Sequence, residues 1–362
     1  MKLTEMKVRN FTVFEQADFA FAPGINVFIG ENGTGKSHVL QALYAVLKGV
    51  RNQPVDESEA ARWQRDRLAE IFKVDGGNAS AVGSLVRVGN ERVGKENEGA
   101  TLSVAAGQQA ETQIKIAPSG ELTVAKQSWS APLDATFLPA RDVLAMCEGF
   151  VPIYERHRIS FDEAYRDACL ALALPELKGS AKQAADVLSA PFRTMLGGDV
   201  TLENGRFHVD FGAGKHEAHL VAEGLRKIAA LVQLTGNGSI HDGSVLLWDE
   251  PEANMNPRLI AKLASALHGL AASGVQLFIA THDYLLSHKL SLAAEYSTAP
   301  KIEMRFFSLH HGGPLEPVEV ESAPTLAQMS NNAILDEYAQ HYEDERSLYQ
   351  RELEQDLKDG AR

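Results

Sequence analysis

Cysteine is scarce in this 362-residue chain, which carries only Cys147 and Cys169, without metal-ligand spacing around them. A disulfide framework is therefore not expected, and two reduced thiols are typical of a cytoplasmic protein. Apolar runs are short as well: none approaches the ~20 residues that span a bilayer. The opening segment alternates like a strand and lacks the apolar core of a signal peptide. We therefore expect a cytoplasmic protein with no membrane association.

A surplus of positive charge is also missing, because 48 acidic residues outweigh 35 basic ones and give a formal net charge of -13. A surface attracted as a whole to nucleic acid is thus disfavoured, although a local basic patch is compatible with this charge. Hydrophobic residues at 44% and charged residues at 23% are typical of a globular protein. The length predicts about two domains.

A glycine-rich loop between two apolar segments is the strongest local signal. Residues 25–29 predict a buried strand, and apolar residues at helical spacing after Ser37 predict a helix. The spacing Gly30-x4-Gly35-Lys36-Ser37 is the P-loop pattern. Its glycines let main-chain N–H groups surround a phosphate, the lysine reaches the β- and γ-phosphates, and the serine hydroxyl binds Mg²⁺. We expect nucleotide contacts from Gly30, Glu31, Asn32, Gly33, Thr34, Gly35, Lys36, Ser37 and His38.

A second apolar strand, predicted over residues 245–248, ends in two carboxylates, Asp249 and Glu250. A P-loop requires a carboxylate for Mg²⁺ and a group that positions the attacking water. We expect Asp249 to hold the metal together with Ser37, and Glu250 to orient or deprotonate the water. The alternative is a strand that simply ends in solvated acids.

Other segments predict how the chain is organised around these motifs. Residues 150–196 predict helices broken at Pro175 and Pro191, and residues 200–215 predict a hairpin. His310 and His311 are expected in a glycine-rich turn at the surface. Three segments alternate apolar and polar residues and predict antiparallel strands: 81–89, 99–107 and 112–129.

The segments "NFTVFEQADFAFAPGINVFIGENGTGKS" and "WDEPEANMNP" together resemble the ABC-type ATPase superfamily, and within it the AAA-labelled branch with RecF, SMC and OLD-like proteins. The resemblance covers nearly the whole chain. It implies ATP and Mg²⁺ as ligands and ATP hydrolysis as the activity. In fold it implies an α/β P-loop NTPase of ABC-ATPase type: a mixed sheet flanked by helices, an antiparallel β subdomain and a helical insertion.

Within this resemblance, "VAEGLRKIAAL" lies where the family carries a signature helix, whose N-terminal end binds the γ-phosphate of ATP held by the other subunit. Ala222 replaces the usual serine and Glu223 a glycine, so the contact is expected from main-chain groups of Ala222, Glu223 and Gly224, with Arg226 or Lys227 as possible helpers. An ordinary amphipathic helix explains the segment equally well.

His282 follows the buried strand "LFIAT" and takes the place of the family's switch histidine, which contacts the γ-phosphate and the attacking water. The resemblance thus implies Lys36, Glu250 and His282 as the catalytic residues. "ANMNP" matches the D-loop, with Asn256 facing the partner's site; a plain turn before a helix is the alternative.

Two further matches are less specific. "VRNF" resembles the segment that supports adenine, which points to Arg9 and Asn10. "FLPARDVL" falls where transporter subunits sense Mg²⁺ with a glutamine, but no glutamine is present, so Arg141 and Asp142 are the candidates. The expected parts are an N-terminal lobe (1–149), a helical insertion with a hairpin (150–218), a C-terminal lobe (219–330) and an acidic helix (331–362).

A signature that acts in trans predicts a homodimer that clamps two ATP molecules and separates after hydrolysis. No second catalytic cluster follows His282, so a separate effector protein is expected, and the resemblance suggests a bacterial DNA-related or phage-defence setting. The main alternative is a DNA-binding repair or recombination clamp of RecF/SMC type. A transporter subunit and a non-hydrolysing nucleotide sensor are two others, and the sequence disfavours both.

Overall fold

The P-loop strand lies in the middle of a six-stranded sheet in the computed structural model, which describes all residues except 51–55, 88–98, 158, 297–300, 314–315 and 360–362. The strand order is β14-β13-β3-β12-β11-β7. All neighbours pair in parallel except β14, which is antiparallel to β13. The strands are β3 (Ile25–Gly30), β7 (Ala135–Leu138), β11 (Val245–Asp249), β12 (Gln276–Ala280), β13 (Met304–His311) and β14 (Val318–Ala323).

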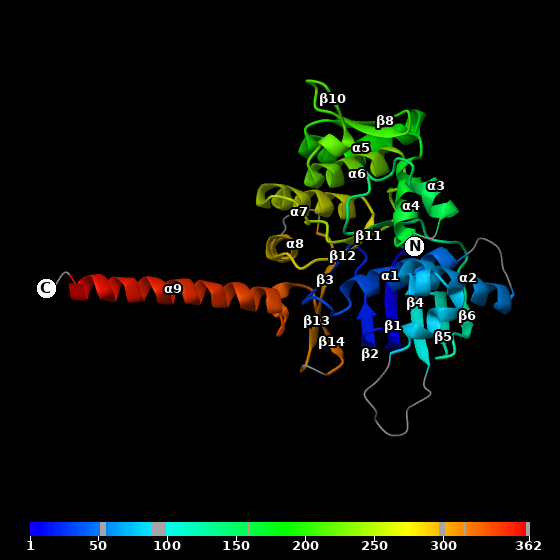
Figure 1. Ribbon diagram of the computed structural model, residues 1–362, viewed down its shortest axis with the longest axis horizontal. Helices are drawn as coiled ribbons and strands as arrows, with labels where there is room; N and C mark the ends of the chain where they lie inside the picture. Colours follow the sequence, from blue (N-terminus) through cyan, green and yellow to red (C-terminus); the bar gives the residue numbers. More distant parts are fainter. Residues whose placement is uncertain (51–55, 88–98, 158, 297–300, 314–315, 360–362) are drawn as a thin grey trace.

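Two apolar cores cover the two faces of this sheet, as its continuous apolar strands predict. Ile25, Val27 and Ile29 of β3 belong to one core, and Phe28 belongs to the other. Helix α1 (Lys36–Gly49) covers the Phe28 face. The opposite face is covered by α6 (Glu223–Gly236), α7 (Pro257–Ala272) and α8 (Tyr284–Tyr296). Sheet and helices thus form the layers of an α/β domain (Figure 1).

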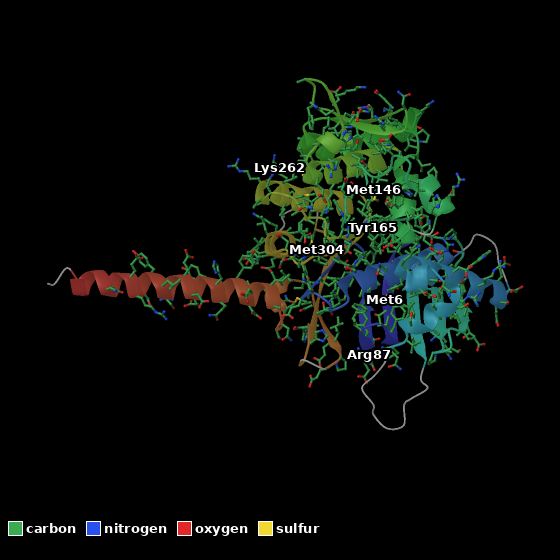
Figure 2. All side chains as sticks on the ribbon, in the orientation of Figure 1. Met6, Arg87, Met146, Tyr165, Lys262 and Met304 are labelled. Atoms are coloured by element: carbon green, nitrogen blue, oxygen red, sulfur yellow. The ribbon has the colours of Figure 1, made fainter. Side chains whose placement is uncertain are left out.

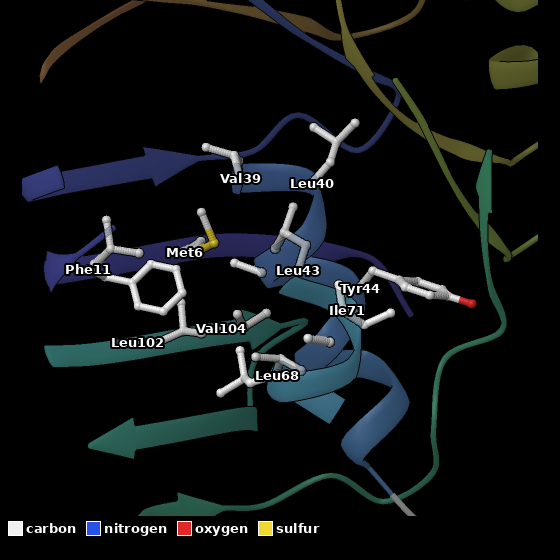
Figure 3. Packing of buried hydrophobic residues seen from close by; sticks show 14 of the residues in the cluster. Met6, Phe11, Val39, Leu40, Leu43, Tyr44, Leu68, Ile71, Leu102 and Val104 are labelled. Carbon is white, nitrogen blue, oxygen red and sulfur yellow. The ribbon is translucent and has the colours of Figure 1, made fainter. Parts of the chain in front are cut away.

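A five-stranded antiparallel sheet packs beside α1, in the order β2-β1-β4-β5-β6. Its strands are β1 (Leu3–Phe11), β2 (Phe14–Ala20), β4 (Ala100–Ala106), β5 (Ala110–Ile116) and β6 (Leu122–Gln127). Figure 3 shows Leu43 of α1 and Leu68 of α2 (Glu57–Phe72) packed over Leu102 and Val104 of β4. The antiparallel β subdomain predicted from residues 99–107 and 112–129 is therefore confirmed.

The strand predicted over residues 81–89 is wrong. Residues Ala79–Leu85 form a 3₁₀ helix, and only Val86 makes an isolated bridge, to Phe11; residues 88 and 89 lie outside the described ones. The cause is tertiary packing: Val82 is buried, and a Cβ at Gly83 would overlap the carbonyl oxygen of Pro118. Apolar alternation alone did not reveal this contact.

The helical insertion contains α3 (Phe150–Arg156), α4 (Glu163–Leu172) and α5 (Gly179–Leu196), followed by a small sheet of β8 (Asp199–Glu203), β9 (Arg206–Asp210) and β10 (Lys215–Glu217). The predicted break at Pro175 and the predicted hairpin are confirmed. The predicted break at Pro191 is wrong, because α5 runs through it. Phe192 and Leu196 are buried after the proline, and the carbonyl that Pro191 leaves without its helical donor belongs to Val187, whose side chain is exposed to solvent.

The turn predicted at His310 and His311 is also wrong, although His311 is exposed as predicted. Both residues form the end of β13 and pair with Glu319 and Val318 of β14. The acidic helix predicted near the end of the sequence is present as α9 (Ala333–Asp359), which extends away from the layered body (Figure 1). Among the helices of the described residues, none has the length and apolar character needed to cross a membrane.

Candidate active site

The glycine-rich loop joins β3 to α1 in a conformation that two of its glycines make possible. Gly30 has φ +145°, and a Cβ there would overlap the carbonyl oxygen of Leu309. Gly35 has φ +92°, and a Cβ there would lie 2.6 Å from Cγ2 of Val13. In the described part of the chain, no side chain caps the N-terminus of α1 and no acid lies in its first turn. Its first N–H groups are therefore free to bind an anion.

The P-loop lysine is buried in this loop. Lys36 Nζ donates hydrogen bonds to the carbonyl oxygens of Gly30 and Glu31, both at 2.8 Å. Burial lowers the pKa of Lys36, while the carboxylates of Glu250 and Asp249 act in the opposite direction. A buried ammonium group between main-chain carbonyls gains a favourable partner when phosphate oxygens enter the loop.

The two residues predicted to hold Mg²⁺ meet at the end of β11. Asp249 accepts a hydrogen bond from Ser37, and burial raises the pKa of Asp249 to about 6 despite that bond and the nearby Lys36. A hydroxyl and a partly compensated buried carboxylate are hard oxygen ligands of the kind Mg²⁺ prefers. In the described residues no group of three or more His, Cys, Asp or Glu could hold a metal alone. The pair fits an ion that takes its other ligands from water and substrate phosphates.

Glu250 occupies a strained position immediately after β11. Its φ is +45°, in the left-handed region that non-glycine residues rarely adopt. Its main chain is fixed on both sides: the N–H donates to the carbonyl oxygen of Ala280 at 2.9 Å, and the carbonyl accepts from Nζ of Lys227 at 2.9 Å. Strain of this kind persists only where the surroundings enforce it, and it is concentrated at functional sites.

His282 completes the cluster from the next strand. Asp249 of β11 and Ala280 of β12 are paired in parallel register, so the segments after both strands leave the sheet at one edge. His282 Nδ1 lies 3.3 Å from Oε1 of Glu250, and its side chain is about half exposed. The structure therefore brings together the three residues predicted to be catalytic with the two predicted metal ligands.

Sequence reasoning missed Glu252, the second glutamate of "WDEPE". Its side chain is only 5% exposed, and its Oε1 accepts a hydrogen bond from the Thr281 hydroxyl at 2.6 Å and lies 3.9 Å from Nδ1 of His282. Its Oε2 is buried without a hydrogen-bond partner among the described residues. Burial raises the pKa of Glu252. The only feature of the sequence that could have pointed to Glu252 is its place two residues after Glu250, as a third acidic residue beside Asp249 and Glu250.

Arg226 and Lys227 were expected as helpers toward a partner's ATP, but both make their contacts within the chain. Lys227 is 4% exposed and reaches Glu250, as described above. Burial lowers the pKa of Lys227, and the carboxylate of Glu252 opposes this most strongly. Arg226 Nε pairs with Asp142 Oδ2 at 2.6 Å. Asp142, which was a candidate for sensing Mg²⁺, therefore anchors α6 instead. The buried apolar face of α6 fixes the rotation of this helix about its axis, and this rotation sets the directions of the Arg226 and Lys227 side chains.

The N-terminus of α6 presents the segment that resembles a signature. Ala222 occupies the N-cap position without a capping side chain, and Leu220 before it is exposed. Gly224 permits close packing, since a Cβ there would lie 2.8 Å from the carbonyl oxygen of Asn254. Asn256 caps α7 by accepting from the N–H of Leu259 at 3.0 Å, which supports the plain-turn interpretation of this residue.

The other residues predicted to contact the nucleotide have local partners of their own or are exposed. Arg9 pairs with Asp18 of β2 at 2.8 Å, and Asn10 has φ +50° inside β1, immediately before its last residue, Phe11. The imidazole of His38 packs against the ring of Phe72 at 5.6 Å between centroids, and burial lowers its pKa. A contact between His38 and nucleotide must therefore come from its main chain. Glu31 and Asn32 are exposed at the loop tip.

Family models and relatives match parts of this chain. The model of an "AAA ATPase domain" matches residues 1–112, and that of "AAA domain, putative AbiEii toxin, Type IV TA system" matches residues 121–287. DNA replication and repair protein RecF of Edwardsiella ictaluri is 35% identical over 96 residues, 26% of this chain and 27% of that protein. RecF of Pectobacterium atrosepticum is 33% identical over 95 residues, 26% of each chain. The chain thus matches only about a quarter of the length of these relatives.

Solved structures extend the similarity to the whole fold. An SMC head bound to the C-winged helix domain of ScpA gives a TM-score of 0.59 at 12% identity, covering 90% of this chain and 98% of that one. The SMC head domain from Thermotoga maritima gives 0.51 at 11% identity, covering 88% and 98%. The fold is accordingly that of the ABC-type ATPase heads, with a mixed sheet flanked by helices. Together with the two domain models and the RecF relatives, this fold supports a relationship of the chain to the RecF/SMC-like group of AAA ATPases.

Proposed function

We propose that this protein binds ATP with Mg²⁺ and hydrolyses it. The observation that supports this best is the convergence of the Lys36 loop, the Ser37–Asp249 pair and the Glu250–His282 pair at one edge of the six-stranded sheet. In this proposal the loop amides and Lys36 bind the β- and γ-phosphates. Ser37 and Asp249 hold Mg²⁺, which when bound neutralises charge that develops on the phosphates.

Glu250 orients the attacking water and accepts its proton, and His282 holds the γ-phosphate in line with that water. The bond from Lys227 to the Glu250 carbonyl keeps this carboxylate on a fixed main chain, so little reorganisation precedes the reaction. Arg9 and Asn10 support the adenine at the margin of the site.

We further propose that ATP joins two copies head to tail, with the α6 N-terminus of each copy facing the ATP of the other. The support is a helix N-terminus without a cap among the described residues, next to an exposed Leu220. The dimer then acts as a switch for a separate protein in the cytoplasm, possible settings being bacterial DNA metabolism and phage defence. Lobe 1–149 of one copy would supply the P-loop to a site, lobe 219–330 of the same copy would supply Asp249, Glu250 and His282, and the α6 N-terminus would come from the other copy.

The decisive experiment compares Glu250→Gln with Lys36→Ala in Mg-ATP, by measuring mass in solution and phosphate release. Glu250→Gln should trap an ATP-dependent dimer that does not turn over, and Lys36→Ala should stay monomeric. Glu319→Gln, an exposed glutamate on β14, is the matched control and should hydrolyse ATP like the unaltered protein. If both active-site variants stay monomeric, the proposed ATP-dependent dimer is refuted. If the unaltered protein releases no phosphate, the proposed ATP hydrolysis is refuted.

The second candidate is a DNA clamp, favoured by the relatives named for DNA replication and repair. The test is anisotropy of a labelled duplex with the Glu250→Gln protein in Mg-ATP. A clamp with basic contacts should bind and should lose at least about tenfold in affinity between roughly 50 and 200 mM salt. Absence of binding at low salt would exclude this function.

A further inference from the structure

Helix α9 carries its large side chains in solvent. Figure 2 shows them as sticks along a helix that stands apart from the layered body. Tyr342 is 65% exposed and Tyr349 is 63% exposed, and Leu335, Tyr338 and Leu348 are exposed as well. In the described helices of the body, apolar side chains of this size are mostly buried in the two cores. An exposed apolar row on a long helix is typical of a binding surface.

The spacing of these residues defines the shape of the occupant. Leu335, Tyr338, Tyr342 and Tyr349 follow one another at intervals of three, four and seven residues. They therefore form one narrow stripe along the helix, as in the seam of a coiled coil, and we refer to these four residues as the α9 stripe. A stripe this narrow fits one other helix laid along it.

The charge of α9 selects among possible occupants. Nine of its residues are Asp or Glu and three are Lys or Arg. A second copy of α9 would bring like charges together, and nucleic acid or an anionic membrane would be repelled in the same way. A helix rich in Lys and Arg meets no such penalty. We propose that α9 is the docking helix for a separate protein, which lays a basic amphipathic helix along the α9 stripe.

A contact at the root of α9 connects this docking helix to the proposed switch. Tyr284, two residues after His282, packs on Tyr338 with ring centroids 4.6 Å apart. Asp283 fixes the start of α8 to this segment, because its Oδ1 accepts from the N–H of Leu286 at 2.6 Å. A shift of His282 on ATP binding is thus transmitted through Tyr284 to the stripe. This coupling between ATP binding and α9 rests on the proposed function, whereas docking of a helix on the α9 stripe does not.

The docking test uses a labelled synthetic peptide of about four heptads, with Leu in its seam and Lys beside it, and full-length protein without nucleotide. The peptide should bind, and Tyr342→Ser with Tyr349→Ser should weaken binding by about tenfold or more. Tyr296→Ser, which changes an exposed tyrosine at the end of α8, should leave the affinity unchanged. Equal binding of a scrambled peptide, or no binding, would overturn the proposal. Self-association that the double substitution abolishes would assign the stripe to a second copy instead.

The coupling test repeats the titration with Glu250→Gln protein, with and without Mg-ATP. The peptide affinity should change by about fivefold or more on ATP binding, and Tyr338→Ala should abolish that change while ATP is still bound. Binding of ATP is measured separately with a fluorescent analogue. Bound ATP with an unchanged peptide affinity would refute the output role of α9. Failure to bind ATP at all would refute the proposed function and leave the docking result in place.

Discussion

Replacing Lys227 by methionine tests how α6 supports the active site. The substitution keeps the length and apolar stem of the side chain and removes its charge. It deletes the bond to the Glu250 carbonyl, a charge-assisted bond of the kind that contributes about 1.5–3 kcal/mol. It also removes a buried positive charge that interacts favourably with the carboxylate of Glu252.

These two losses are partly offset, because methionine avoids the cost of burying the ammonium group of Lys227. We therefore expect the free energy of unfolding to fall by about 2 kcal/mol, the size of the lost charge-assisted bond. We also expect the rate of ATP hydrolysis to fall by about tenfold to a hundredfold, because Glu250 loses one of its main-chain supports. Affinity for ATP should change little, since the hydrogen bond that Lys227 donates goes to the Glu250 carbonyl and not to the P-loop.

Urea denaturation without nucleotide gives the free energy of unfolding, and phosphate release gives the rate. Lys262→Met, at the outer side of α7 in Figure 2, is the control and should change stability by less than about 0.5 kcal/mol. Adding Glu252→Gln to Lys227→Met should recover part of the lost stability, because the unpaired carboxylate is then removed. A loss below about 1 kcal/mol together with an unchanged rate would refute the reasoning.

Three other substitutions test single features of the site and of the helical insertion, where Asp162 caps the N-terminus of α4. Gly30→Ala should abolish binding of a fluorescent ATP analogue because its Cβ meets main-chain atoms of β13, whereas Gly33→Ala, where no atom lies within 4 Å, should bind measurably; equal loss in both would contradict the steric argument. Burial raises the pKa of Asp162 to about 6 from an ordinary value near 3.8, so its stabilising effect is complete below pH ~4 and lost as pH rises through 6. In urea titrations from pH 4 to 7, Asp162→Asn should remove a decline of up to about 3 kcal/mol, and parallel pH profiles would disprove this. Gly224→Ala should lower the melting temperature, since its Cβ crowds the turn before α7, and an unchanged melting curve would exclude that contact.

The core of the site could be predicted from the sequence because its signals are local. The P-loop depends on the spacing of Gly30, Gly35 and Lys36 between a strand and a helix, and all three are fixed by neighbours in the chain. Asp249 and Glu250 follow one buried strand, so their position at its end follows from periodicity alone. Parallel strands then bring both motifs to one edge of the sheet.

What the sequence did not predict depends on distant contacts. The inward direction of Lys227 depends on how α6 is rotated against the sheet, which no local pattern encodes. Pro191 is tolerated inside α5 because buried residues hold the helix on the far side of the proline. His310 was assigned to a turn because glycines follow it, yet β14 pairs with it and extends β13. In each case tertiary packing overrode a valid local preference.

The central place of β3 bears on how the protein is made. Ile25 pairs with Leu277 on one side and with Met304 on the other, so the neighbours of this early strand are encoded 252 and 279 residues later. During translation, β3 leaves the ribosome before β12 and β13, so both of its edges stay unpaired until those strands have been made. Contacts this remote in sequence make folding slow and leave an apolar strand open to aggregation. Nascent chains that stop before residue 277 should consequently depend on chaperones and bind no nucleotide.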